Sequence, residues 1–199
     1  MIARVLIPKS DGAAVAVSLV AALPLAALPG EILPQTIAAV VVACLAAWIA
    51  WQDATTFTIP DGGVAGLVLV GAALRLGEGL DALHEARFVL MGLAVDAGLC
   101  AGTLLLLREL FYRRRGYDGL GFGDVKLGLA GGVLLGAQGF AWATCAACAL
   151  ALAVVLARRI AGRPMGLRDR IPLGAFLAPA ILLAWAVVRI IPSLDATRM

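Results

Sequence analysis

Charged residues and aromatic residues are both scarce in this chain. Of its 199 residues, 15% are charged and 6% are aromatic, whereas 62% are hydrophobic, and the mean hydropathy is +0.99. Because a soluble globular domain has about 25% charged residues, this composition argues against an ordinary soluble enzyme or binding module. We therefore predict an all-α polytopic integral membrane helix bundle, organised as a single domain over residues 1–199.

Histidine is nearly absent, and the chain has neither a second C-x-x-C pair nor a stripe of basic residues. Cys145 and Cys148 form a lone C-x-x-C inside an apolar run, and the chain has one histidine. A structural zinc site usually needs four ligands, so we predict no metal site and interpret these cysteines as small residues that face lipid or other helices. The net charge of +3 comes from basic residues in particular loops, which argues against a nucleic-acid partner.

Long hydrophobic runs are what the chain does contain. A membrane-spanning helix needs about 20 apolar residues. Most of the runs approach that length, but the third is short and the fifth is shorter still. We therefore predict six to seven transmembrane helices, from runs at 12–28, 34–51, 62–76, 88–107, 125–137, 140–157 and 172–191.

The first run allows two interpretations. Arg4 and Lys9 precede it and Ala-Ala-Leu-Pro-Gly ends it, which is the pattern of a secretory signal peptide. The run is also long enough to remain as an uncleaved first helix, and a chain with this many spans needs no cleaved signal. We favour the uncleaved helix, and expect helix 12–28 to lie at the periphery of a core formed by residues 34–191.

The positions of the basic residues predict the orientation in the membrane. With seven spans and a cytoplasmic amino terminus, the cytoplasmic segments are 1–11, 53–61, 108–124 and 158–171. Most of the 16 basic residues fall in or next to these segments, as the positive-inside rule requires. The same rule favours a helix break near residues 136–139, because one continuous helix from 125 to 157 would put two arginine-rich loops on opposite faces.

Two acids lie at the edges of apolar runs. Asp53 follows Trp51-Gln52, and Asp124 lies within Gly121-Phe-Gly-Asp-Val-Lys126. Taken alone, Asp53 fits a solvated loop acid, and Asp124 fits an amino-terminal helix cap. Taken together, two carboxyl groups held close share a proton, so that one acts as general base on water and the other as general acid. The pair therefore suggests an aspartyl protease in the membrane.

Three segments together resemble the type IV prepilin peptidase family, the bacterial GxGD aspartyl proteases. They are D-x5-I-P at 53–60, G-x-G-D-x-K at 121–126 and I-P-L-G-A-F-L-A at 171–178. The resemblance covers roughly residues 40–190 and implies an endopeptidase of the bacterial cytoplasmic membrane, with its active site facing the cytoplasm. It implies that the enzyme cleaves leader peptides of type IV prepilin or pseudopilin precursors, contacts membrane lipids and needs no cofactor.

The resemblance also assigns residues to the site. Asp53 and Asp124 become the catalytic pair. Residues of the surrounding motifs become neighbours of the substrate: Gly121, Gly123, Lys126, Ile59, Pro60 and Asp61. Pro60 disfavours helix at Ile59, so we expect segment 54–61 to be an extended or turn-like flap beside the site.

Two features depart from the family pattern. Asp61 stands where the family usually has asparagine, which adds a third carboxylate near the site and leaves its role open. Longer members carry paired C-x-x-C motifs in an amino-terminal domain that is linked to methylation. No such motif precedes Asp53 in this sequence, so we expect a peptidase without that domain.

A small secondary transporter is the alternative from another functional class. Asp96 lies in the middle of the fourth run, where an acid normally faces the interior of a bundle. With Asp53 and Asp124 it could form a proton or cation relay. For a peptidase, Asp96 belongs either to a structural bond with a neighbouring helix or to the water network of the active site.

Overall fold

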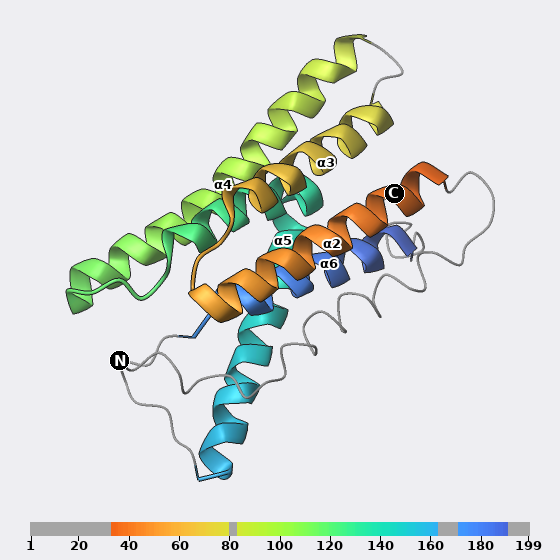
Figure 1. Cartoon of the computed structure of the whole chain (residues 1–199). Helices are drawn as coiled ribbons and strands as arrows, with labels where there is room; N and C mark the ends of the chain where they lie inside the picture. Colours follow the sequence, from red (N-terminus) through yellow and green to blue (C-terminus); the bar gives the residue numbers. More distant parts are fainter. Residues whose placement is uncertain (1–32, 80–82, 163–170, 191–199) are drawn as a thin grey trace.

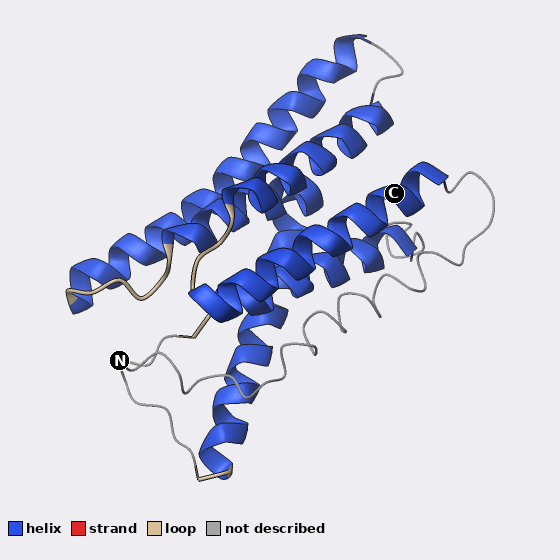
Figure 2. Cartoon of the chain, in the orientation of Figure 1, coloured by secondary structure: helices blue, strands red, loops and turns tan. Residues whose placement is uncertain are grey.

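The computed structural model describes residues 33–79, 83–162 and 171–190 (Figure 1). Over these ranges the chain contains helices and loops but no strand (Figure 2), which confirms the all-α prediction for them. The predicted first helix at 12–28 lies outside the described residues. The helices are α2 (Leu33–Thr56), α3 (Asp61–Gly79), α4 (Leu83–Arg115), α5 (Phe122–Ile160) and α6 (Leu173–Ile190).

Three segments of the described chain are long and apolar enough to cross a membrane. They are Ile37–Thr56 in α2, Arg87–Arg115 in α4 and Phe122–Ile160 in α5, while α6 contributes a shorter apolar segment, Leu173–Val188. The expected count of six to seven spans is therefore not confirmed. One reason is that the two runs predicted at 125–137 and 140–157 are joined in the single element α5.

The element α5 is nevertheless interrupted where the sequence predicted a break. Gly136 has φ 75° and ψ 169°, which is not helical. Glycine adopts this conformation readily because it has no Cβ. The two halves of α5 point in clearly different directions, one lying along α4 and the other turning away from it (Figure 1). The predicted break near 136–139 is thus confirmed at Gly136.

Helix α4 is longer than its apolar run. The sequence predicted a span that ends at Leu107 and an arginine-rich connection from Arg108, but the helix continues to Arg115. Hydropathy locates the edge of the lipid, whereas backbone hydrogen bonding continues beyond that edge. The last turn is supported by an ion pair one turn apart, with Arg113 Nε 2.8 Å from Glu109 Oε1.

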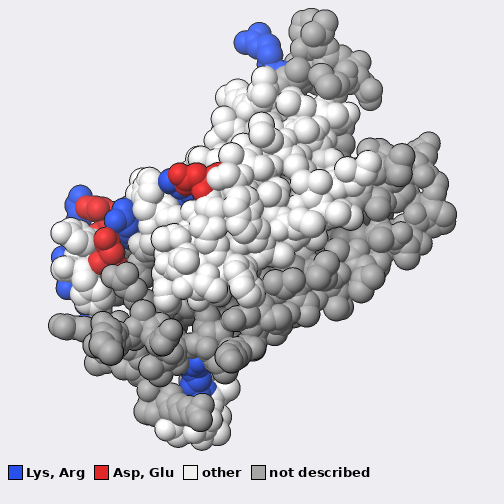
Figure 3. Space-filling model, viewed as in Figure 1, with Lys and Arg blue, Asp and Glu red and all other residues white. Residues whose placement is uncertain are grey.

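The helices bury one face and expose apolar side chains on the other. The largest fully buried side chains come from α2, α3, α5 and α6 and include Ile49, Leu127 and Ile181. Leu69, Phe88 and Trp142 remain at least 70% exposed, as expected for groups that face lipid. In Figure 3, charged atoms gather mainly near the end of α4, and much of the described surface carries no charge.

Glycines allow α4 and α5 to pack closely. A Cβ at Gly132 would lie 2.6 Å from the backbone oxygen of Asp96 and 3.0 Å from Sγ of Cys100, and a Cβ at Gly128 would lie 2.7 Å from Cδ1 of Leu104. Small residues at such interfaces let the backbones of membrane helices approach each other. The two glycines therefore set the separation of these helices.

Replacing Gly132 by alanine is expected to lower the free energy of unfolding by about 1–3 kcal/mol. The added methyl group would press against the backbone oxygen of Asp96, which cannot rotate away as a side chain can. Unfolding in detergent, followed by circular dichroism, measures the effect. The matched control is Gly102→Ala on α4, where an added Cβ has no neighbour within 4 Å. Equal stabilities of the two variants would contradict the close contact at Gly132.

Candidate active site

Asp53 and Asp124 are the two buried charged side chains of the described residues. Their relative exposures are 6% and 7%. Asp53 lies in the last turn of α2, and Asp124 lies in the first turn of α5. The two carboxyl groups are near enough to interact electrostatically, so the bundle brings together acids that are 71 positions apart in the sequence.

The Asp53 carboxylate is bound by the start of α6. Its Oδ2 accepts a hydrogen bond of 2.9 Å from the backbone N–H of Ala175, in the first turn of that helix. The first N–H groups of a helix have no partner within the helix, and the helix dipole favours negative charge at this end. Asp53 therefore caps α6 from outside, and α6 in turn fixes the position of the carboxylate.

The Asp124 carboxylate caps its own helix with one oxygen. Its Oδ2 accepts a 3.2 Å bond from the N–H of Gly121, and the N–H of Asp124 donates to the oxygen of Gly121. The second oxygen, Oδ1, is buried and accepts no hydrogen bond from the described residues. This arrangement leaves one carboxylate oxygen available for a proton or for a reacting molecule.

Two glycines and Ile59 fill the space between the starts of α5 and α6. A Cβ at Gly123 would lie 3.0 Å from Cβ of Ile59. A Cβ at Gly174 would lie 2.8 Å from Cδ1 of Ile59 and 2.9 Å from Oδ2 of Asp53. Side chains larger than hydrogen are therefore excluded at both positions unless Ile59 or Asp53 moves, and the backbones of both helices lie next to the acids.

The loop between α2 and α3 is shorter than expected. The sequence predicted a flap over 54–61, but α2 continues to Thr56 and α3 begins at Asp61. The hydroxyl of Thr56 donates to the backbone oxygen of Gln52 at 2.7 Å and supports the last turn of α2. Phe57, with φ 55°, then ends the helix in a left-handed conformation that bulky residues rarely adopt. The non-helical segment is thus limited to 57–60.

Lys126 and Asp61 form an ion pair at the surface of the site. Lys126 Nζ lies 2.7 Å from Asp61 Oδ1, and the side chains are 40% and 77% exposed. Pro60 directly precedes Asp61, and its backbone oxygen accepts hydrogen bonds from the N–H groups of Gly63 and Val64 in the first turn of α3. Asp61 thus starts α3 and pairs with a lysine, rather than joining the two buried acids.

Asp61→Asn is expected to change kcat/KM for a cleaved precursor by no more than a few-fold. An exposed ion pair contributes about 1 kcal/mol or less, and asparagine also serves at the start of a helix. Initial cleavage rates of the two proteins at equal concentration measure the effect. Lys126→Gln, which removes the other partner, is the matched control. Complete loss of cleavage in Asp61→Asn alone would give Asp61 a catalytic role.

Two contributors to the site were missing from the predicted site residues. Gly174 and Ala175 belong to the third segment of the family resemblance. Gly174 has no side chain and so leaves room for the Asp53 carboxylate, and Ala175 donates its backbone N–H to that carboxylate. Pro172 directly before the helix was the available signal, because proline favours a helix start. Every non-proline residue has an N–H group, so the sequence could not identify the donor.

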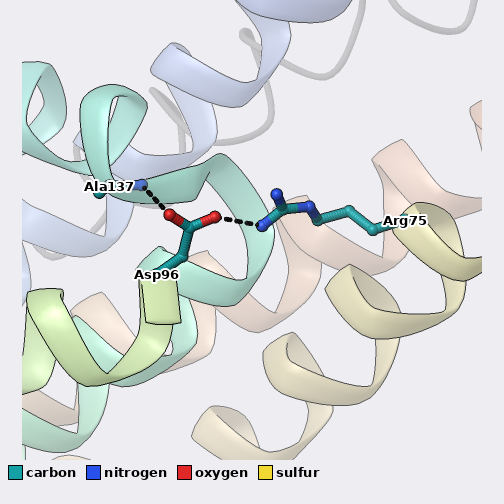
Figure 4. Close-up of polar contacts among 3 residues, drawn as sticks. All are labelled: Arg75, Asp96 and Ala137. Atoms are coloured by element: carbon teal, nitrogen blue, oxygen red, sulfur yellow. Dashed lines mark hydrogen bonds and ion pairs between the residues drawn. The ribbon is translucent and has the colours of Figure 1, made fainter. Parts of the chain in front are cut away.

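Asp96, on α4, does not bond to either of the two buried acids. It bonds to Arg75 and to the backbone at the break in α5. Its Oδ2 lies 2.7 Å from Nη1 of Arg75 on α3, and its Oδ1 accepts a 3.2 Å bond from the N–H of Ala137 (Figure 4). These partners correspond to the structural alternative considered for this residue.

No cluster of metal ligands is present within 33–79, 83–162 and 171–190. In these ranges no three His, Cys, Asp or Glu side chains are grouped so as to hold an ion. Cys145 and Cys148 are exposed and unbonded to each other.

The sequence matches the model of a known protein family. A model of the type IV leader peptidase family matches residues 39–156, which is more than half of the chain. The matched range includes both buried acids and ends before α6, which binds Asp53. No curated protein and no solved structure matches the chain.

Proposed function

Because the chain belongs to the type IV leader peptidase family, we propose that it is a membrane aspartyl endopeptidase. Its substrates are type IV prepilin-like or pseudopilin precursors, from which it removes the leader peptide. The observation that carries this proposal is the pair of buried carboxyl groups: Asp53, at the end of α2, is bound by the start of α6, and Asp124 lies in the first turn of α5.

The two carboxyl groups supply the acid and the base of peptide hydrolysis. The ionised carboxylate takes a proton from water as the oxygen attacks the scissile carbonyl carbon, while the protonated carboxyl group donates its proton to the carbonyl oxygen. When the tetrahedral intermediate collapses, the C–N bond breaks and the leaving amine takes a proton from the first carboxyl group. The second carboxylate takes a hydroxyl proton from the intermediate, so the product is a carboxylic acid and the pair returns to one ionised and one protonated group. The N–H groups of Ala175 and Gly121 stabilise each carboxylate as it forms.

The transporter alternative has less support. It requires Asp96 to exchange protons or cations with Asp53 and Asp124. Asp96 is paired with Arg75 and bonded to the backbone of Ala137, so it serves as a partner in fixed contacts rather than as a relay group. The family match likewise supports a peptidase.

Coexpression with a candidate prepilin tests the proposal. We expect the precursor to lose its leader, and amino-terminal sequencing of the product to give one new terminus. A parallel culture that expresses the Asp124→Asn variant controls for host peptidases. Precursors that remain intact beside the folded protein, across several pilin and pseudopilin types, would argue against the function.

We assign the active site to the cytoplasmic side of a bacterial inner membrane. This assignment rests on the basic residues at the end of α4, including Arg114, close in sequence to Asp124. We expect a cysteine introduced at Arg114, in a variant without native cysteines, to react with an impermeant thiol reagent only after the membrane is opened. Reaction in intact cells would reverse the assignment.

A further inference from the structure

At the break in α5, the backbone N–H of Ala137 donates its hydrogen bond to a side chain of another helix, α4. At Gly136 the backbone leaves the helical conformation, so the N–H groups that follow begin a new helical segment. The first N–H groups of a helix lack partners of their own, and in lipid each unsatisfied group costs several kcal/mol. Asp96 on α4 accepts the bond from Ala137 at this position (Figure 4).

Arg75 makes it possible for Asp96 to carry a charge there. A carboxylate inside an apolar bundle is costly unless it is paired. Arg75 Nη1 lies 2.7 Å from the other carboxylate oxygen, and the side chains of Arg75 and Asp96 are 30% and 21% exposed. The three groups join α3, α4 and the break in α5. Arg75 offsets the cost of a carboxylate in an apolar bundle, and the carboxylate offsets the cost of the unsatisfied N–H group of Ala137.

A row of glycines connects this break to Asp124. Gly136, Gly132 and Gly128 are spaced by four residues, and the next position in the row is Asp124. Residues at this spacing form a ridge along a helix. Gly132 touches the backbone of Asp96 itself, and Gly128 touches the next turns of α4. The first half of α5 thus packs against α4 along the turns that lead from Gly136 toward Asp124.

We propose that Asp96, held by Arg75, is a positioning residue for Asp124. By capping the second half of α5 at Ala137, it fixes where the first half ends, and the glycine contacts transmit that position over about 18 Å to Asp124. The effect on cleavage rests on the proposed function, whereas the cap at Ala137 does not.

Three double variants separate the effect of the cap from that of the ion pair. Arg75→Gln/Asp96→Asn removes both charges but keeps an amide oxygen that can accept the bond from Ala137. Arg75→Gln/Asp96→Ala differs from it only by lacking that acceptor. The charge exchange Arg75→Asp/Asp96→Arg keeps an ion pair but presents a cation to the N–H group. Glu109→Gln is the control, because it breaks an exposed pair on the same helix.

The experiment combines hydrogen exchange with kinetics on purified full-length protein in detergent. In the variant with alanine and in the charge exchange, we expect the amide of Ala137 to exchange at least about tenfold faster than in the wild type, since its acceptor is gone. We also expect kcat per folded molecule to fall about tenfold or more with KM within about twofold, because a displaced acid affects the chemical step more than binding. The variant with asparagine and Glu109→Gln should stay within about threefold of wild type.

The remaining outcomes overturn the proposal in different ways. If the asparagine and alanine variants have equal kcat and equal exchange at Ala137, the cap has no positioning role. If the charge exchange behaves as wild type, the ion pair alone is what matters. If the alanine variant loses only folded yield, with an unchanged kcat, Asp96 is merely structural. Should the wild type cut no precursor, the proposed function fails, while the exchange rates at Ala137 still decide whether the cap exists.

Discussion

Replacement of either Asp53 or Asp124 by asparagine is expected to abolish cleavage of a prepilin precursor. Asparagine keeps the size of the side chain and its hydrogen-bonding capacity, but it can neither take a proton from water nor donate one as a carboxylic acid. Because one group must act as base and the other as acid, neither variant retains a complete pair. Accumulation of mature product, measured by gel shift and mass spectrometry, should fall below detection in both.

The double variant provides a second test of the same pair. Residues that act as one unit show strongly non-additive effects, so Asp53→Asn/Asp124→Asn should be no worse than either single change. Membrane insertion should be retained, since an amide still accepts the bonds from Ala175 and Gly121. Asp118→Asn, which alters an acid that is 53% exposed, should cleave normally. Near-normal cleavage by Asp53→Asn or by Asp124→Asn would contradict the proposed aspartyl mechanism.

Gly174→Ala is expected to reduce kcat/KM by roughly ten- to a hundredfold, because a displacement of about 1 Å at a catalytic group costs up to about that much. The new Cβ would lie 2.9 Å from Oδ2 of Asp53 and 2.8 Å from Cδ1 of Ile59. Ile59 can rotate away, but the carboxylate is tied to the adjacent N–H of Ala175. The methyl group therefore acts directly on the position of a proposed catalytic oxygen. Steady-state cleavage of a purified precursor measures the loss.

A control at another helical glycine separates this effect from a general effect of alanine. Gly98→Ala on α4 adds a methyl group where no atom lies within 4 Å. Alanine favours the helix by about 1 kcal/mol relative to glycine, so this variant should keep full activity and equal or higher stability. Equal activities of Gly174→Ala and Gly98→Ala would show that the start of α6 does not hold Asp53 in the working enzyme.

Local patterns in the sequence predicted the helices and the two acids. The apolar runs correspond to α2 through α6 within the described residues, and Pro60 and Pro172 directly precede the starts of α3 and α6. The loop charges also predicted the break that is observed at Gly136. These features depend on partition into lipid and on the conformational freedom of single residues, and both are properties of a short stretch of chain.

The ends of the helices were harder to predict, for a physical reason. Helix α2, which carries Asp53, continues to Thr56, although a non-helical flap was predicted from residue 54. Helix α4 continues to Arg115, although its apolar run ends at Leu107. Hydropathy reports which residues prefer lipid, while a helix ends where its backbone bonds end. Hydroxyl bonds at Thr56 and the ion pair at Arg113 extend the two helices past the apolar limit.

Only the tertiary structure decided which groups meet in the site. Asp53 binds Ala175, which is 122 positions away, and Asp61 binds Lys126, which is 65 positions away. The resemblance to a family had named Asp53 and Asp124 as a pair, but it gave neither their burial nor their backbone partners. An N–H group is the same in nearly every residue, and a carboxylate can pair with any of 16 basic side chains in this chain. The packing of the helices selects among these partners, because it alone determines which distant segments come within hydrogen-bond distance.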